Sequence, residues 1–198
     1  MIELDANLLA ELVPLSWLLG AWEGTGVVDY AVGDEARNHE FGQRMSFSQD
    51  GLPHLAYTSY TWLLDEARTP LATETGYWRL SRRATDGDPG PGLLAGVGVR
   101  PFITAAAVET LRNAEGGFDV EALIVHPGGI SEAYLGQATG PRIDLATDAV
   151  LRTATAKEHT ASRRLYGLVE GHILWAWDIA TAGHGLATHA SGRLARVD

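Results

Sequence analysis

The chain contains no cysteine among its 198 residues. This absence excludes disulfide bonds, cysteine-based zinc sites, iron–sulfur clusters and thiol catalysis. Basic residues are also scarce, because 15 lysines and arginines stand against 25 aspartates and glutamates, for a formal charge of −10. Such a chain lacks the basic surface that binds phosphate backbones, so we expect no nucleic-acid partner.

Long apolar runs are missing as well. No stretch approaches the roughly 18 uninterrupted apolar residues of a membrane-spanning helix. The N-terminus, Met1-Ile2-Glu3-Leu4-Asp5, is acidic where a signal peptide would be basic. We therefore expect a cytoplasmic protein without membrane contact, built as one domain over residues 1–198 and large enough to bury a core without cross-links.

The first segment with a clear pattern is a short N-terminal helix. Asp5 or Asn7 would cap its first turn, and Pro14 would begin a second turn that ends at Leu18. A GxWxGxG stretch follows and contains Gly20, Trp22, Gly24 and Gly26. Glycine inside a strand usually marks a bend or the close approach of another backbone. The stretch predicts a sharply bent first strand in which Trp22 plugs a barrel.

Strand patterns dominate the rest of the chain. Apolar and polar residues alternate at period two in Arg44-Met45-Ser46-Phe47-Ser48, and in residues 172–179 the odd positions are apolar. Other strand-like segments are residues 55–62, 73–80, 118–126, 130–137, 142–150, 153–162, 164–169 and 186–197. Short strands at near-regular spacing predict an all-β fold, an antiparallel up-and-down barrel of about ten strands. A barrel of this size has room for one small ligand.

Residues 82–117 interrupt the strand pattern. The run Asp86-Gly87-Asp88-Pro89-Gly90-Pro91-Gly92 cannot form a strand ladder or a helix interior, and residues 105–112 resemble a short helix ended by glycines. We interpret the segment as a surface insertion. It would serve either as a structural decoration or as a lid over the pocket.

Seven motifs occur in order along residues 14–198, outside the insertion. They are GxWxGxG, Leu55-Ala56-Tyr57-Thr58 with Trp62, Glu74-Thr75-Gly76-Tyr77-Trp78-Arg79, His126-Pro127-x-Gly129-Ile130-x-Glu132, Ala156-Lys157-Glu158, Leu165-Tyr166-Gly167-Leu168-Val169-Glu170-Gly171, and Leu186-x-x-His189 with Leu194. In these motifs the chain resembles the nitrobindin family, small haem-binding β-barrels shaped like fatty-acid-binding proteins.

The resemblance implies a site and an activity. It implies that His189 holds the ferric iron of haem b, that Lys157 contacts the haem, and that the pocket wall contains Leu71, Ala72, His126 and Ile179. It implies further that the chain binds nitric oxide and isomerises peroxynitrite to nitrate. One protein ligand leaves the opposite face of the iron open for such small molecules. A homodimer is left open by the resemblance.

His189 meets this expectation only under a geometric condition. Strict alternation places Ala190, Gly192 and Leu194 on the inward face and would turn His189 outward. The segment must therefore bend between Thr188 and Ala190.

The sequence leaves alternatives for the other histidines and for the function of the protein. His126 fits either a turn-lining residue before Pro127 or a group that hydrogen-bonds a ligand in the pocket. The remaining histidines are interpreted as surface residues because their contexts are polar or turn-like: His39, His54, His159, His172 and His184. An alternative function is a haem-less carrier of an apolar molecule such as a fatty acid, with Arg44 or Arg79 holding its carboxylate. A third is a haem-less relative that acts through protein partners.

Overall fold

Alternation of apolar and polar residues produces strands that bury one row of side chains and expose the other. In residues 44–48, Met45 and Phe47 are buried, whereas Arg44 and Ser46 lie on the outer face. The computed structural model describes residues 8–32, 35–180 and 185–197. Over these residues the chain forms ten strands: β1 Gly20–Val32, β2 Glu35–Ser48, β3 Leu55–Leu63, β4 Pro70–Leu80, β5 Phe118–His126, β6 Ile130–Ala138, β7 Arg142–Arg152, β8 Ala161–Val169, β9 His172–Ala180 and β10 Ala187–Val197.

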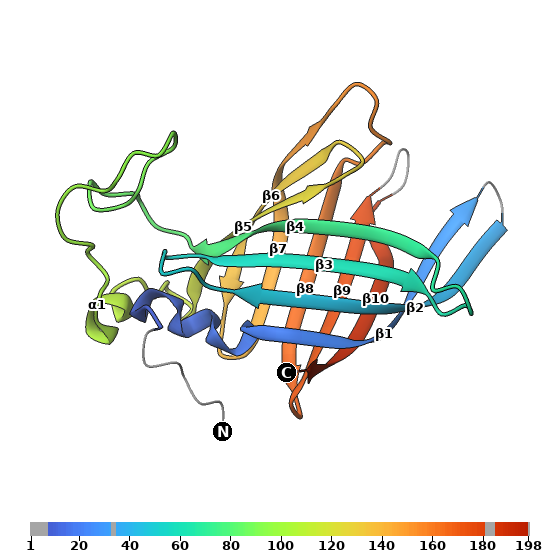
Figure 1. Ribbon diagram of the computed structural model, residues 1–198, viewed down its shortest axis with the longest axis horizontal. Helices are drawn as coiled ribbons and strands as arrows, with labels where there is room; N and C mark the ends of the chain where they lie inside the picture. The colour runs from blue at the N-terminus through green and yellow to red at the C-terminus, as the bar shows by residue number, and fades with distance from the viewer. Residues whose placement is uncertain (1–7, 33–34, 181–184, 198) are drawn as a thin grey trace.

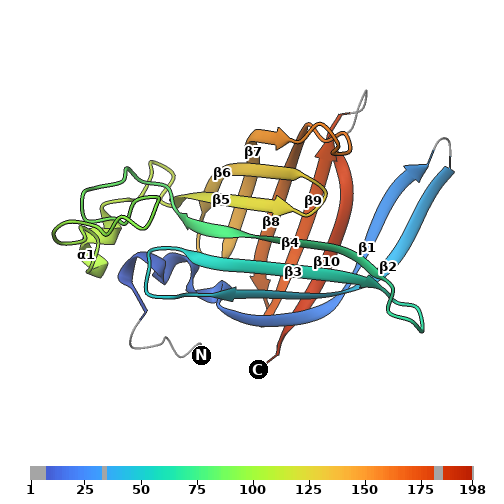
Figure 2. The same ribbon diagram turned by 45° about the horizontal axis from the view of Figure 1, so that its top comes forward.

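Each strand pairs antiparallel with the next one along the chain, and β1 pairs with β10 to close the barrel. Strands β1 to β4 run across the direction of β7 to β10, so the barrel wall consists of two crossing layers (Figures 1 and 2). The apolar faces of both layers form one core. The prediction of an antiparallel up-and-down barrel is confirmed.

One predicted strand is absent at the expected place. Residues 153–160 form a loop between β7 and β8, and the next strand begins only at Ala161. The loop starts with a turn in which the backbone N–H of Ala156 donates to the carbonyl of Thr153 at 3.1 Å. The segment contains no alternating row of large apolar side chains that a strand could bury. The strand propensity of its threonines was therefore not sufficient to form a strand.

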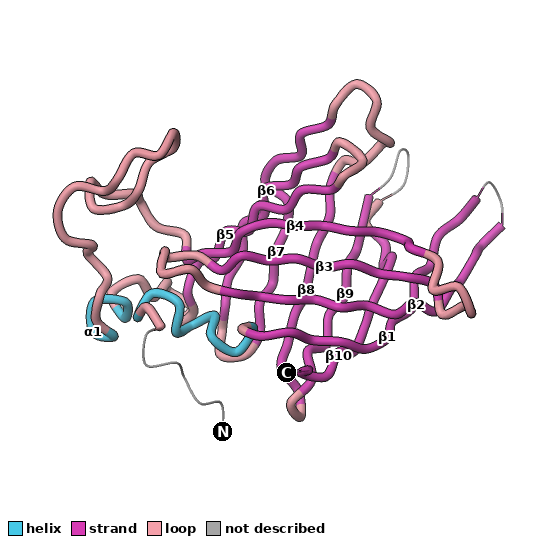
Figure 3. The backbone as a smooth tube through the Cα atoms, viewed as in Figure 1, coloured by secondary structure: helices cyan, strands magenta, loops and turns pink. Residues whose placement is uncertain are grey.

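Helices cover one end of the barrel (Figure 3). The predicted N-terminal helix is a 3₁₀ helix, η1, from Ala10 to Leu18, which buries Leu12 and Leu15 against the core. Asp5 and Asn7, the predicted caps, lie outside the described residues. Helix α1, from Ala105 to Glu109, packs beside η1 and is shorter than the pattern at 105–112 predicted. Neither helix, within the described part of the chain, is long and apolar enough to cross a membrane.

The connection from β4 to β5 leaves the barrel at this helical end, opposite the turn between β3 and β4 (Figure 1). Arg82 anchors it: one guanidinium binds Glu11 of η1 at 2.5 Å and Asp88 of the connection at 2.6 Å. The Arg82 side chain is only 5% exposed. This ion-paired anchor fixes the start of the segment to the closed end of the barrel.

The GxWxGxG stretch forms the seam where the barrel closes. Trp22 is buried, and its indole N–H donates to the carbonyl of Leu18 at 2.7 Å. A Cβ atom at Gly24 would collide with the backbone carbonyl of Arg193 in β10, and one at Gly26 would collide with that of Ser191. Glycine is therefore required for β1 and β10 to approach this closely.

We predict that Gly24→Ala lowers the free energy of unfolding by about 1–3 kcal/mol, because the added methyl group forces β1 away from β10. Urea denaturation measures the change. Gly128→Ala is the matched control, since no atom lies within 4 Å of a Cβ built there. Equal stability of the two variants would contradict the close approach at this seam.

Candidate functional site

The pairing of β9 with β10 contains an irregularity at His189. Thr188 pairs with Asp178, and the next pair joins Ala190 to Trp177, so His189 is an extra residue between the two pairs. Such a β-bulge bends a strand and re-aims a side chain. As a result His189 and Ala190, although adjacent, both line the same internal cavity. The bend that the sequence required between Thr188 and Ala190 is confirmed.

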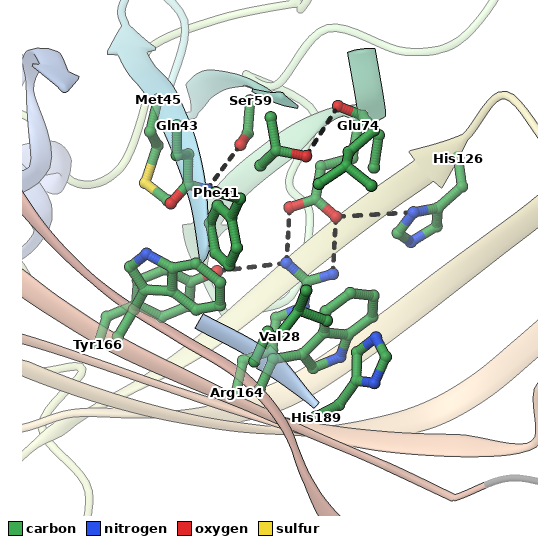
Figure 4. A pocket seen from close by; sticks show the side chains of 16 residues that line it. Val28, Phe41, Gln43, Met45, Ser59, Glu74, His126, Arg164, Tyr166 and His189 are labelled. Atoms are coloured by element: carbon green, nitrogen blue, oxygen red, sulfur yellow. Dashed lines mark hydrogen bonds and ion pairs between the residues drawn. The ribbon is translucent and has the colours of Figure 1, made fainter. Parts of the chain in front are cut away.

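The cavity has a volume of about 280 Å³. Most of its lining is apolar, but several polar side chains from different strands also face it (Figure 4). The lining residues are Val28, Phe41, Gln43, Met45, Ser59, Thr61, Leu71, Ala72, Glu74, His126, Arg164, Tyr166, Trp175, Trp177, His189 and Ala190. Leu71, close to the turn between β3 and β4, is 45% exposed and marks the mouth.

In the His189 imidazole, Nδ1 has a hydrogen-bond partner, whereas Nε2 has none among the described residues. Nδ1 lies 3.0 Å from the backbone carbonyl oxygen of Asp29 in β1. A carbonyl oxygen only accepts, so Nδ1 carries the hydrogen and Nε2 keeps its lone pair. Burial lowers the pKa of His189 below its ordinary value of 6.5, against the opposing effect of the Asp29 carbonyl. The side chain is therefore a neutral imidazole with a free Nε2 at neutral pH.

A buried ion pair lies beside this imidazole. The Arg164 guanidinium donates to both carboxylate oxygens of Glu74, at 2.7 and 2.8 Å, and to the hydroxyl of Tyr134 at 2.9 Å. Burial by itself would raise the pKa of Glu74, but the charge and hydrogen bonds of Arg164 outweigh it and lower the pKa. Tyr57 donates a further hydrogen bond to Glu74. The pair is thus fully ionised and bidentate.

A second buried carboxylate, Glu132, has three hydrogen-bond partners and one more distant charged neighbour. His126 Nε2 lies at 2.9 Å, His159 Nε2 at 2.7 Å and the Ser162 hydroxyl at 2.7 Å, while Arg164 is 3.8 Å away. Burial would raise the pKa of Glu132, but the hydrogen bonds from the two histidines, with the Arg164 charge, lower it far below its ordinary value. Because the carboxylate accepts, both histidines carry a hydrogen on Nε2.

The structure brings four of the six expected cofactor contacts to the cavity wall. They are Leu71, Ala72, His126 and His189. Lys157 is exposed in the loop between β7 and β8 and does not line the cavity. Ile179 lies two residues beyond Trp177 in β9, half-buried, and is also outside the lining.

Comparisons with known proteins agree with this geometry. Residues 11–196 match the family model described as "THAP4-like, heme-binding beta-barrel domain". The chain is 65% identical over 198 residues to a protein from Leifsonia xyli subsp. xyli named "Peroxynitrite isomerase", and 67% identical over 199 residues to one of the same name from Clavibacter michiganensis subsp. michiganensis. Both alignments cover 100% of each chain. The chain belongs to the THAP4-like haem-binding β-barrel family.

A solved structure shows the same fold. The crystal structure of Rv2717c from M. tuberculosis superposes with a TM-score of 0.68 at 27% identity, covering 99% of this chain and 100% of that one. The alignment spans both the barrel and the helical end of this member of the family.

The cavity residues suit the haem of this family. A haem macrocycle is apolar and needs a neutral nitrogen for its iron. Phe41, Met45 and Trp175 supply apolar wall, and His189 supplies a nitrogen whose lone pair is not engaged in a hydrogen bond to Asp29. The Asp29 carbonyl is the kind of partner that orients metal-binding histidines. The donor set therefore fits the group.

Sequence reasoning missed the charged residues of the site. His159, interpreted as a surface residue, is 9% exposed and bound to Glu132, 27 positions away, so that interpretation is wrong. Arg164 was not singled out, and Glu74 was named only as the first residue of a β4 motif, without a role. Their pairing was missed because 90 positions separate them and neither strand is unusual on its own. His184 lies outside the described residues.

The lid interpretation of residues 82–117 does not fit this site. The segment starts at the helical end of the barrel, opposite the turn between β3 and β4 (Figure 1). Arg82 fixes that start, whereas Leu71 and Ala72, close to the turn, line the cavity.

We predict that Glu132→Gln destabilises the protein at pH 7 by at least about 2 kcal/mol, because several hydrogen bonds to a charged group are weakened. The folded-state pKa of Glu132 is lowered from 4.5, so this contribution is fully present above about pH 4.5 and is lost as the pH falls below it. Urea denaturation from pH 7 to pH 3 should show the wild type and the variant converging.

The control is Glu121→Gln, which removes a partly exposed pair with Arg79 and should cost about 1 kcal/mol or less. A wild-type advantage over Glu132→Gln that stays constant down to pH 3 contradicts the lowered pKa.

Proposed function

We propose that the protein is a haem-dependent peroxynitrite isomerase in which His189 Nε2 would hold the iron of a ferric haem b. The observation that carries the proposal is the bulged His189, neutral and hydrogen-bonded through Nδ1, with Nε2 left free beside an apolar cavity. The relatives named as peroxynitrite isomerases support the choice of reaction.

When bound, ferric haem would supply a Lewis-acidic iron for nitric oxide or for peroxynitrite, whose product is nitrate. The residues of the chain supply the environment. Asp29 holds His189 in the tautomer that binds iron. Phe41 and Trp175 line the cavity with apolar surface, which would limit the access of water to the bound substrate.

The other residues expected to contact the haem are considered by their distance from the cavity wall: three line it and two lie near its mouth. Leu71 and Ala72 lie at the mouth, and His126 lies on the wall with both ring nitrogens towards carboxylates. His126 therefore acts as part of the polar wall. Lys157 lies in a loop at the mouth end, where its ammonium group is available for a haem carboxylate, and Ile179 extends the Trp177 face of β9 towards the same end.

A fatty-acid carrier is less well supported. Arg44 pairs with Glu23 and Arg79 pairs with Glu121, both partly exposed and outside the cavity lining. Arg164 does face the cavity, but Glu74 already neutralises it through two hydrogen bonds. A carboxylate ligand would have to displace a buried carboxylate of the protein itself, which is costly.

The proposal includes a cytoplasmic location, for which a chain without cysteine is suited, and small-molecule ligands in place of nucleic acid, in keeping with the charge of −10. A homodimer is compatible with it.

We predict that His189→Ala abolishes the intense Soret absorption of the haem complex and weakens haem binding by at least about 100-fold, more than the loss of an orienting group usually costs. Haem titration followed by absorption spectroscopy measures this. Stopped-flow decay of peroxynitrite with nitrate analysis measures the activity, which should be lost in the variant.

His172→Ala is the control, because His172 lies on the opposite face of β9 and bonds Glu170 and Arg193. Wild-type haem affinity in His189→Ala would overturn the ligand assignment. Haem binding through His189 without faster peroxynitrite decay would overturn the activity alone.

A further inference from the structure

Trp177 lies beside the bulge that presents His189. Ala190 pairs with Trp177, and His189 is the extra residue just before that pair. The indole and imidazole rings meet edge to face, with centroids 5.6 Å apart and planes at 84°. The imidazole therefore has a neighbour from each side: the Asp29 carbonyl in β1 and the Trp177 ring in β9.

These two contacts restrict different motions. The hydrogen bond from Nδ1 to Asp29 selects the tautomer and one direction of the ring. It leaves the ring free to swing about the N–H···O axis, because the terminal torsion of histidine is broad. An aromatic ring packed at right angles against the imidazole blocks that swing, since edge-to-face geometry is a preferred arrangement of aromatic pairs. The plane of the imidazole is thus determined by Trp177.

Trp177 is itself held in place. The guanidinium carbon of Arg164 lies 4.3 Å from its ring centroid, and Arg164 pairs with Trp177 across β8 and β9. The ring of His126 stacks parallel to the indole, with centroids 6.0 Å apart and planes at 6°. Arg164 cannot move freely, because Glu74 holds it through two hydrogen bonds. A line of contacts therefore runs from Glu74 through Arg164 and Trp177 to His189.

The indole N–H of Trp177 is buried and, among the described residues, has no hydrogen-bond partner. The contacts of Trp177 with His189, Arg164 and His126 are all made by its ring. This separates the role of Trp177 from that of a hydrogen-bond donor.

We propose that Trp177 is the positioning residue for the His189 imidazole, and that the buried Arg164–Glu74 pair acts on His189 through Trp177. The proposal rests on the function proposed above only for its consequence in haem binding. The ordering of the imidazole belongs to the haem-free protein and is measured there.

The first measurement uses haem-free protein with isotope-labelled histidine. In the wild type, the ring current of the indole displaces the NMR resonances of the His189 ring, identified by their loss in His189→Ala. Trp177→Phe retains an aromatic neighbour and keeps them displaced. Trp177→Leu fills space without a ring, and the resonances move to the positions of a solvated histidine.

The second measurement is the rate of haem transfer to apomyoglobin. Trp177→Leu should release haem about tenfold faster than the wild type, as is usual when a group that orients a metal ligand is removed. Trp177→Phe should stay within about twofold. Trp62→Leu is the control. The Trp62 ring packs between Gly42 and the guanidinium of Arg68 and does not line the cavity. Its replacement should leave haem release unchanged.

The paired variant Glu74→Gln/Arg164→Met tests the line of contacts if Trp177→Leu fails to fold. It removes both charges together, so neither is left buried alone. Haem release more than about twofold faster than in the wild type supports the proposal, and the wild-type rate overturns the part assigned to the ion pair.

Two results overturn the role of Trp177. The first is that Trp177→Leu keeps the His189 resonances and the haem-release rate of the wild type. The second is that Trp177→Phe and Trp177→Leu change both measurements equally. Displaced resonances that depend on Trp177 in a protein that binds no haem support the positioning and refute the proposed function. The two ideas therefore fail separately.

Discussion

The extra residue in β10 is the constraint on which the site depends. In a regular strand, neighbouring side chains point to opposite faces, so Ala190 in the cavity would place His189 outside. The bulge between the Thr188 and Ala190 pairs allows both to face inward. A bulge leaves part of the ladder unpaired. The hydrogen bond from His189 to the Asp29 carbonyl offsets part of that loss and gives the imidazole the tautomer that a metal requires.

Two buried carboxylates at or near the cavity are held by charged and hydrogen-bonding partners. Glu74 and Glu132 are both buried carboxylates, and both have lowered pKa values because Arg164 and hydrogen-bond donors surround them. A buried charge that is paired on all sides rigidifies its surroundings, whereas one left alone is strongly destabilising. Arg164 also packs on Trp177, so the same network that neutralises the carboxylates fixes the aromatic ring beside His189.

The two ends of the barrel have different roles, because the helices lie at one end and the cavity opens at the other. Helices η1 and α1 and the connection anchored by Arg82 gather at one end (Figures 1 and 3). The cavity opens at the other end, and its lining combines residues from eight strands (Figure 4). Changes in the helical end should therefore alter stability before they alter the site.

The period-two pattern was sufficient to predict the fold, because burial of one face per strand is a local property of the sequence. It identified the inward rows of β2 and β9 correctly, including Met45 and Ile173. It failed where the structure depends on distant partners. His159 is buried because Glu132 lies opposite it, and the loop at 153–160 follows from a lack of residues to bury. The bulge was required by the role of His189, but no local signal in β10 shows it.

The most direct test of the account is a crystal structure of the haem complex. The account predicts iron bonded to Nε2 of His189, with Nδ1 still donating to the Asp29 carbonyl and the imidazole held at right angles to Trp177. Iron bonded to His126 or His159, or haem located away from the cavity with His189 unbound, would contradict it.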